Sequence, residues 1–346
     1  MITPSDRLAT LGWTPEFLRQ LDLAELNSTI PARVTGVHRN RIDVLAAEGA
    51  LELIPASDLS TADVAVGDWL LARDGIALRV LDRRTELARK AAGSTVARQL
   101  IAANLDTALI VSSCNNDFNV GRLERYLVLA AQAGIEPVVV LTKADACADP
   151  ASYVAKAQAM QRGLSVIALN ARADDVPQAL ADWCRKGHTV VLLGSSGVGK
   201  TTLSNALTGG SAAVQDIRLD DAKGRHTTTS RSLVEMTGGG WLIDTPGVRE
   251  LQLTDVADGI EVLFDDLTAL AAACRFSDCT HGVEPGCAIQ AAIAAGDLDA
   301  GRLERWEKLK REDRFNSQSI HQAHARNRAF GKMHRKIGDK RNPGRK

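Results

Sequence analysis

A glycine-rich loop between a short apolar run and a helix-compatible segment constrains the fold more than any other feature of this chain. Residues 194–201 have the sequence GSSGVGKT, which fits the phosphate-binding pattern G-x-x-x-x-G-K-[S/T]. The apolar run at residues 189–193 predicts a buried strand, and residues 201–207 predict a helix that ends at Gly209 and Gly210. This order of strand, loop and helix predicts a phosphate-binding loop in an α/β domain.

The residue types in this loop suit phosphate binding. Glycines let backbone N–H groups converge on phosphate oxygens, and the helix N-terminus adds a partial positive charge. Lys200 is predicted to bridge the β- and γ-phosphates, and the Thr201 hydroxyl is predicted to ligate Mg²⁺. The predicted contact residues are Gly194, Ser195, Ser196, Gly197, Val198, Gly199, Lys200, Thr201 and Thr202.

A second motif, Thr142, Lys143, Ala144 and Asp145, follows a β-branched run at residues 137–141. That run predicts a strand whose carboxyl end presents the motif, where ligands bind in open α/β sheets. The Asp145 carboxylate would accept hydrogen bonds from N1 and N2 of guanine, which adenine cannot donate. An ATP-using enzyme remains an alternative only if Asp145 is not at the base. Asn170 and Ala171, after a predicted strand at residues 165–169, are the expected companion base contact.

The order of the motifs indicates a circular permutation. Asp244 and Gly247 lie in a D-T-P-G sequence that supplies a carboxylate for Mg²⁺ and a glycine that senses the γ-phosphate. The guanine motif precedes the phosphate loop, although the phosphate loop normally comes first. Gly247 is then followed by about 26 residues before Cys274. We therefore expect the nucleotide state to set the angle between the α/β domain and the carboxy-terminal domain.

Four metal-binding residue types cluster after the α/β region, at Cys274, Cys279, His281 and Cys287. Three thiolates and one imidazole form a closed tetrahedral set, and a reducing cytosol favours metal over a disulfide. The sequence predicts one structural zinc, before a helix expected at residues 302–314. Chance clustering and a disulfide are the alternatives.

The amino-terminal part predicts a helix at residues 15–26 and then a small β-barrel of the oligonucleotide-binding type. Short β-type runs at residues 32–37, 41–45, 69–72 and 76–81 alternate with turns. Trp69 is the only aromatic residue in this stretch, so base stacking is not expected. Its arginines either contact phosphates or are solvated charges on strand faces; they are Arg33, Arg39, Arg41, Arg73 and Arg79.

The formal net charge of zero hides an asymmetry. Residues 302–346 hold 15 Lys and Arg against 5 Asp and Glu, and the rest of the chain holds 27 against 37. The tail is either a solvated end or an arm that folds onto RNA, as cations interleaved with apolar residues suggest. No apolar stretch approaches the roughly 20 residues that span a bilayer, and the amino terminus has no signal pattern. We expect a cytoplasmic protein without a membrane partner.

Together, these motifs resemble the ribosome small-subunit-dependent GTPase A family, which is circularly permuted. Further sequences that carry the resemblance lie at residues 103–106, 117–119, 122–127, 224–229 and 244–249. The resemblance covers about residues 31 to 335. It implies a factor that binds ribosomal RNA late in maturation of the small ribosomal subunit and hydrolyses GTP to GDP when bound there. We also expect the protein to be a monomer. A GTP-gated RNA-binding scaffold with incidental hydrolysis is the alternative.

The expected architecture is multidomain, with four regions. An amino-terminal extension spans residues 1–30, and an RNA-binding barrel of the OB-fold type spans residues 31–88. A circularly permuted P-loop GTPase domain spans residues 92–260, and a mostly helical zinc domain with a basic tail spans residues 261–346.

The catalytic residue must be unusual, because Val248 stands where many GTPases have a glutamine that orients the attacking water. His226 is the candidate replacement, and the alternative is that it is a solvent-exposed loop residue. One of the threonines that follow it, Thr228 or Thr229, is expected to close over Mg²⁺.

Overall fold

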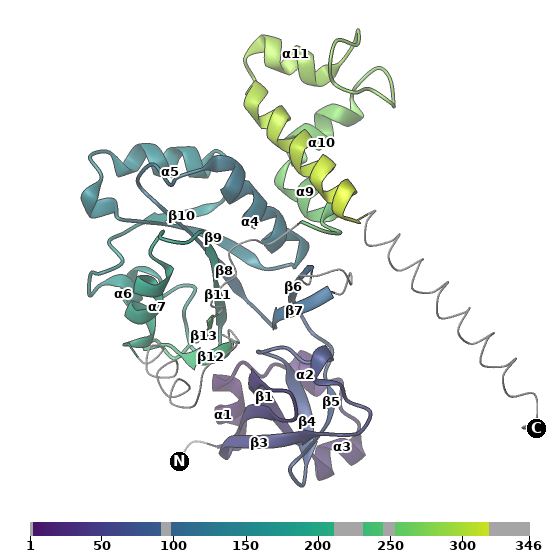
Figure 1. The fold of residues 1–346 in the computed structure, drawn as a ribbon, viewed down its shortest axis with the longest axis vertical. Coiled ribbons are helices and arrows are strands. Elements are labelled where there is room, and N and C mark those ends of the chain that lie inside the picture. The colour runs from purple at the N-terminus through teal and green to yellow at the C-terminus, as the bar shows by residue number, and fades with distance from the viewer. Residues whose placement is uncertain (1–2, 91–97, 211–230, 245–252, 318–346) are drawn as a thin grey trace, which may run out of the picture.

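The structure, a computed structural model, describes residues 3–90, 98–210, 231–244 and 253–317 (Figure 1). Helices α1 (Pro4–Thr10), α2 (Pro15–Leu18) and α3 (Leu23–Ser28) precede the barrel. The prediction of a single helix at residues 15–26 is wrong, because Asp22 caps a second helix, which begins at Leu23. Its carboxylate accepts the N–H of Glu25, and the Glu25 carboxylate accepts the N–H of Asp22, which is a capping box.

Five strands form a closed barrel, as predicted. They are β1 (Ile30–Val37), β2 (Ile42–Ala46), β3 (Gly49–Pro55), β4 (Trp69–Arg73) and β5 (Ile76–Val80). Their order is β1-β2-β3-β5-β4, and β4 closes the barrel on β1. Strand β3 was not among the predicted strands, since only Leu53 is buried in it. Trp69 is fully buried against Trp13, with ring centroids 4.8 Å apart, so it offers no face for base stacking.

A hairpin of β6 (Glu86–Lys90) and β7 (Arg98–Ala103) connects the barrel to a six-stranded sheet. The sheet has the order β10-β9-β8-β11-β13-β12, and only the β12–β13 pair is antiparallel. Its strands are β8 (Thr107–Ser113), β9 (Glu136–Thr142), β10 (Ser165–Ala168), β11 (Thr189–Gly194), β12 (Ser232–Glu235) and β13 (Trp241–Asp244). The α/β domain is therefore confirmed, and β9, β10 and β11 lie where the sequence predicts them.

Helices cover both faces of this sheet (Figure 1). They are α4 (Val120–Gln132), α5 (Pro150–Gln158), α6 (Val176–Ala179) and α7 (Lys200–Thr208). Ile110 and Val139 share a core with residues of α4 and α5, whereas Leu109 and Val138 share a second core with residues of α6 and α7. Because successive side chains point to opposite faces and both faces are covered, the central strands are continuously apolar.

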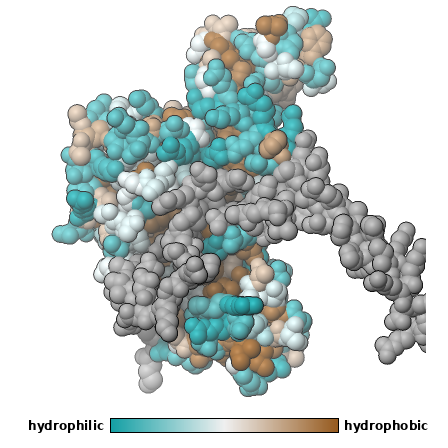
Figure 2. Space-filling view, viewed as in Figure 1, coloured by the Kyte–Doolittle hydropathy of each residue, from teal (hydrophilic) through white to brown (hydrophobic). Residues whose placement is uncertain are grey.

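The carboxy-terminal region is helical. It contains α9 (Ala257–Leu263), α10 (Asp265–Ala272), α11 (Ala288–Ala295) and a C-terminal helix over residues 300–317, which was predicted at 302–314. Helix α9 packs against α4. The visible face of the molecule is mostly hydrophilic, with apolar residues scattered over the barrel and the C-terminal region (Figure 2). Among the described residues, no helix is long and apolar enough to cross a membrane.

Candidate nucleotide site and metal centre

The phosphate loop begins where β11 ends, and its backbone requires glycine at two positions. Gly194 has φ +147°, and a Cβ there would overlap the carbonyl oxygen of Val111 in the neighbouring strand β8. Gly199 has φ +99°, and its Cβ would lie 3.3 Å from Thr142 Oγ1. Side chains rarely adopt either conformation. Helix α7 starts at the next residue, Lys200, so its N-terminus faces the loop as the sequence predicts.

Three cationic side chains border this loop. Lys200 Nζ donates to the carbonyl oxygens of Gly194 at 2.7 Å and Ser195 at 2.5 Å. Lys143 Nζ donates to the Gly197 carbonyl at 3.0 Å, and Arg122 donates from a terminal guanidinium nitrogen to Ser195 Oγ at 2.8 Å. This concentration of positive charge suits a triphosphate. Arg122 was not predicted as a contact residue, although residues 122–127 are among the sequences that carry the family resemblance.

The motif that contains Asp145 is joined to the phosphate loop by side chains. Thr142 ends β9, and its Oγ1 lies 2.5 Å from the Val198 carbonyl oxygen and 3.1 Å from that of Ser112. The hydroxyl can donate only one proton, which these two acceptors share. Thr142 therefore still links the two motifs although it replaces the usual asparagine. Asp145 is exposed, in a short 3-10 turn that follows Lys143 at φ 57°.

The expected companion loop lies beside this turn. The N–H of Ala144 donates to the carbonyl of Leu169 at 3.3 Å, just after β10. Asn170 Oδ1 accepts the N–H of Arg172 at 2.9 Å, which shapes the loop, and Ala171 is buried. The carboxyl ends of β9, β10 and β11 thus bring the predicted base and phosphate contacts to one edge of the sheet.

The other predicted nucleotide residues are described only in part. Asp244 ends β13, which runs parallel to β11, so its backbone reaches the same edge of the sheet. His226, Thr228, Thr229 and Gly247 lie outside the described residues.

Three of the five barrel arginines donate hydrogen bonds to other groups of the protein, although only Arg33 is buried. Arg33 is buried and donates to the Leu11 carbonyl and to Thr189 Oγ1, so it cannot contact RNA phosphates in this fold. Arg79 pairs with Glu25 at 2.7 Å, and Arg73 donates to the Ser28 carbonyl at 2.9 Å. Arg41 is exposed, and its guanidinium lies 3.2 Å from the Glu52 carboxylate. Arg39 is also exposed.

The four predicted metal ligands come together in the C-terminal region. The ligand atoms of Cys274, Cys279, His281 and Cys287 all lie within 4.8 Å of one another. Cys274 Sγ is 3.9 Å from Cys287 Sγ and 3.7 Å from His281 Nδ1. Cys287 Sγ is 3.8 Å from His281 Nδ1. A tetrahedral ion with Zn–S bonds of about 2.3 Å requires sulfur atoms about 3.8 Å apart. The geometry therefore fits a tetrahedral metal ion.

Neighbouring polar groups hold this cluster in shape. Cys287 caps α11, and Gln290 donates to the His281 carbonyl at 2.6 Å. The Glu284 carboxylate accepts the N–H groups of Thr280 at 3.0 Å and Gly282 at 2.8 Å. A hydrogen bond from the backbone N–H of His281 lowers the pKa of the Cys279 thiol. Desolvation and the neighbouring thiols of Cys287 and Cys274 have the larger combined effect and raise this pKa to about 11. A divalent cation would remove this conflict by stabilising the thiolates.

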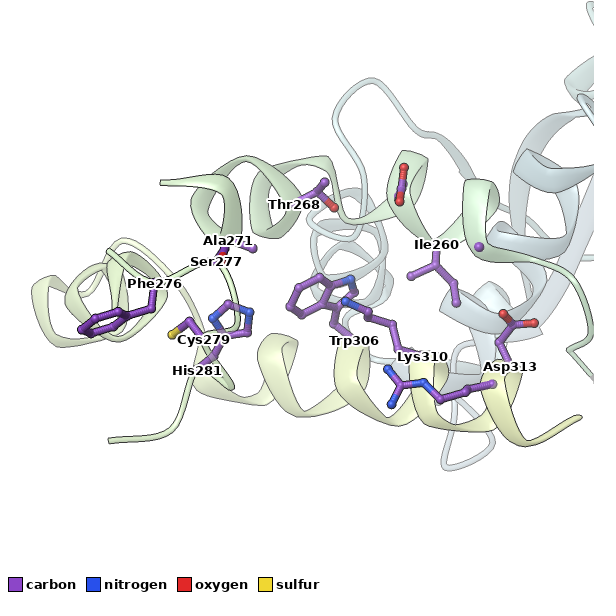
Figure 3. A pocket seen from close by; sticks show the side chains of 13 residues that line it. Ile260, Thr268, Ala271, Phe276, Ser277, Cys279, His281, Trp306, Lys310 and Asp313 are labelled. Carbon is purple, nitrogen blue, oxygen red and sulfur yellow. The ribbon is translucent and has the colours of Figure 1, made fainter. Parts of the chain in front are cut away.

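A cavity of about 490 Å³ adjoins the cluster (Figure 3). Cys279 and His281 lie at one end, and Trp306 and Lys310 of the C-terminal helix lie along it. The Lys310 ammonium nitrogen is 4.0 Å from the centroid of the Trp306 ring, which is the distance of a cation–π contact. Trp306 also packs against the His281 ring, with centroids 5.7 Å apart, so the cluster is continuous with the helical core.

Comparisons with known proteins agree with this geometry. The sequence model of the family described as RsgA GTPase matches residues 80–254. The chain is 50% identical over 319 residues to "Small ribosomal subunit biogenesis GTPase RsgA" of Mesorhizobium japonicum, covering 90% of this chain and 92% of the relative. It is 46% identical over 344 residues to "Small ribosomal subunit biogenesis GTPase RsgA 2" of Vibrio parahaemolyticus, covering 99% and 96%.

Two solved structures share the fold. YjeQ from Thermotoga maritima has a TM-score of 0.60 at 24% identity, covering 81% of this chain and 97% of that one. YloQ, described as a circularly permuted GTPase, has a TM-score of 0.57 at 23% identity, covering 82% and 94%. The permuted order of the motifs is thereby confirmed. The family match, the near full-length relatives and the joined nucleotide motifs show that the chain belongs to the RsgA family of GTP-hydrolysing enzymes.

Proposed function

We propose that this GTPase acts in biogenesis of the small ribosomal subunit, and that the subunit stimulates its hydrolysis of GTP. The names of the near full-length relatives support the ribosomal role. The observation that carries the nucleotide assignment is the Thr142 hydroxyl, which bonds to the carbonyl of Val198 and so places the guanine motif against the phosphate loop. This arrangement suits GTP binding across the ends of β9 and β11, which flank β8 in the sheet.

Within this proposal, Asp145 reads guanine, and Asn170 and Ala171 line the base. Residues 194–202 hold the phosphates, with Lys200 between the β- and γ-phosphates. Thr201, Asp244 and either Thr228 or Thr229 would hold Mg²⁺, which neutralises charge on the phosphates. Gly247 would sense the γ-phosphate. The ion in the Cys₃His cluster is zinc in a structural role, because sulfur and imidazole ligands fill all four positions.

We further propose that His226 orients the attacking water, since Val248 has no hydrogen-bonding side chain. A histidine in the segment before the magnesium threonines is well placed in sequence for this role. Docking on the subunit would then bring the imidazole to the attacking water, so that rapid hydrolysis takes place only in the complex.

RNA contacts in this proposal come from the exposed barrel arginines Arg39 and Arg41 and from the basic tail after residue 317. A positive arm gains affinity by releasing counterions from phosphates, so binding should weaken as salt rises. We also propose that the protein is a cytoplasmic monomer, in line with the ribosomal role that the names of its relatives state.

The decisive experiment measures GTP turnover with and without purified small ribosomal subunits, for the unmodified protein and for His226→Ala. We expect stimulation of at least about tenfold, and we expect His226→Ala to lose most of it while GTP affinity and subunit binding persist. Subunit binding that depends on GTP without any stimulation would favour the scaffold alternative. Stimulated turnover of His226→Ala within about twofold of the unmodified protein would remove His226 from the chemistry.

A further inference from the structure

Arg122 lies where helix α4 meets the phosphate loop. Asn119 caps this helix, and its Oδ1 accepts the N–H of Arg122 at 2.9 Å. The guanidinium then reaches Ser195 Oγ at 2.8 Å. The carbonyl of the same serine accepts the Lys200 ammonium at 2.5 Å. Ser195 is therefore held through its side chain by one cation and through its backbone by another.

The hydrogen bond between Arg122 and Ser195 affects the shape of the phosphate loop more than it affects stability. An exposed hydrogen bond contributes little to stability in general. Here, however, it fixes a residue of the loop whose N–H groups must converge on the phosphates, and small displacements of such a loop cost catalytic efficiency. Arginine suits this task, because its planar fork is rigid and always charged.

Helix α4 is also anchored to the C-terminal helix. The Glu124 carboxylate is fully buried and accepts a hydrogen bond from Arg305 Nε at 2.9 Å. A guanidinium nitrogen of Arg302 lies 3.8 Å from the same carboxylate. In the next position, Arg125 forms a two-pronged pair with Glu312, at 2.5 and 2.7 Å. A buried carboxylate with two cationic partners resists separation, because removing a partner leaves an uncompensated charge. Helix α4 is thus fixed to the C-terminal helix close to the residue that contacts the phosphate loop.

Near its carboxyl end, α4 is tied again. Gln132 accepts the N–H of Gly259 in α9 at 2.9 Å, and a Cβ on that glycine would overlap the Val128 carbonyl of α4. The two helices therefore pack with their backbones in close approach. A shift of the C-terminal helices would move α4 as a body, and its first turn with it.

We propose that Arg122 is a positioning residue for GTP hydrolysis, which acts by holding Ser195, and that α4 carries the position of the C-terminal helix to the phosphate loop. The proposal rests on the nucleotide site of the proposed function but not on the ribosomal partner. It gives the C-terminal region a second connection to the phosphates, separate from the chain that follows Gly247.

The first test compares Arg122→Ala, Ser195→Ala and the double variant in the full chain, by GTP titration and by steady-state turnover without ribosomes. Each single variant should raise KM about threefold to tenfold, and the double variant should be no worse than the more impaired single variant. Arg122→Lys keeps the positive charge but loses the planar guanidinium. Its KM should therefore lie closer to that of Arg122→Ala than to that of the unmodified protein on a logarithmic scale. Arg162→Ala, at an exposed arginine after α5, is the matched control.

Three results would overturn the positioning role. They are a KM for Arg122→Ala within twofold of the unmodified protein, additive losses in the double variant, and a loss that simply follows a lowered melting temperature. A failure of the GTPase assignment would look different, because the unmodified protein and Arg162→Ala would then also lack turnover.

The second test addresses the connection through α4. Glu312→Ala removes the partner of Arg125 without touching the nucleotide site. We expect it to raise KM about twofold in the unmodified background and to have no effect in the Arg122→Ala background. An equal shift in both backgrounds, or no shift in either, would show that α4 does not transmit the position of the C-terminal helix.

Discussion

The phosphate loop and the Cys/His cluster are both predicted ligand sites, but they are built in opposite ways. The loop lies at the end of a buried parallel strand, and its shape comes from glycine backbone angles and neighbouring carbonyl groups. The cluster lies in a short segment between helices, and its shape comes from four side chains whose ligand atoms lie close enough to hold one cation. The sheet therefore preforms the first site, whereas the second has the geometry to be completed by a metal ion.

This difference explains why the motif order could be permuted. The loop and the guanine motif depend on where their strands lie in the sheet, and β9 and β11 flank β8 whatever the chain order. The metal cluster spans only residues 274–287, so its ligands depend on local spacing. We expect backbone changes to damage the first site and ligand changes to damage the second.

The largest effect should come from Gly194→Ala, since the new Cβ would overlap the Val111 carbonyl in a backbone conformation that alanine avoids. We expect a loss of roughly 2–5 kcal/mol in the free energy of unfolding, together with loss of GTP binding. Gly197→Ala is the matched control, because its φ is +82° but its Cβ would meet open space; it should cost only about 1–2 kcal/mol. Urea unfolding of both variants checks this, and equal losses would contradict the packing argument.

Asp145→Asn should weaken GTP binding by about 100-fold and improve binding of xanthosine triphosphate, because the amide can donate to the altered base edge. Asp145 is exposed, so the melting temperature should stay unchanged. Competition titrations with GTP, ATP and xanthosine triphosphate measure the preference. Comparable GTP and ATP affinity in the unmodified protein would remove Asp145 from the base site.

Cys279→Ser should abolish binding of about one zinc ion per chain and expose the C-terminal region to proteolysis, while GTP affinity changes by less than about twofold. Cys184→Ala is the control, since that thiol is buried in another core, and burial raises its pKa to about 12. Metal analysis and limited proteolysis of both variants are the measurements. An unmodified protein without bound metal, purified without chelator, would refute the site.

The smallest effect should come from Thr142→Val, which keeps the shape of the side chain but removes its hydroxyl. Losing one hydrogen bond between the guanine motif and the phosphate loop should weaken GTP binding about fivefold, near 1 kcal/mol. Thr142→Ser should restore most of the affinity. If Thr142→Val binds GTP as tightly as the unmodified protein does, the backbone alone joins the two motifs, and the loop is even more preformed than we infer.

Local signals in the sequence were sufficient for the sites with a fixed pattern. The phosphate loop, the strand before it and the four metal ligands were all predicted from short stretches, because strand periodicity, glycine conformations and ligand spacing are local properties. The same reasoning failed at residues 15–26, where a capping box divides one apolar pattern into two helices. It also failed for β3 and the β6–β7 hairpin, which have too few buried side chains or too weak an alternation to be recognised.

By itself, the sequence determined which residue types are available at both predicted sites and the order of the nucleotide motifs along the chain. Only the tertiary structure decided which distant side chains meet. Arg33 is buried against Thr189, 156 residues away, although the sequence left it free to contact RNA phosphates. Arg122 reaches Ser195 across 73 residues, and Arg125 reaches Glu312 across 187. Such contacts depend on how strands and helices pack and on the rotamers that this packing permits, and no local pattern in the chain encodes them.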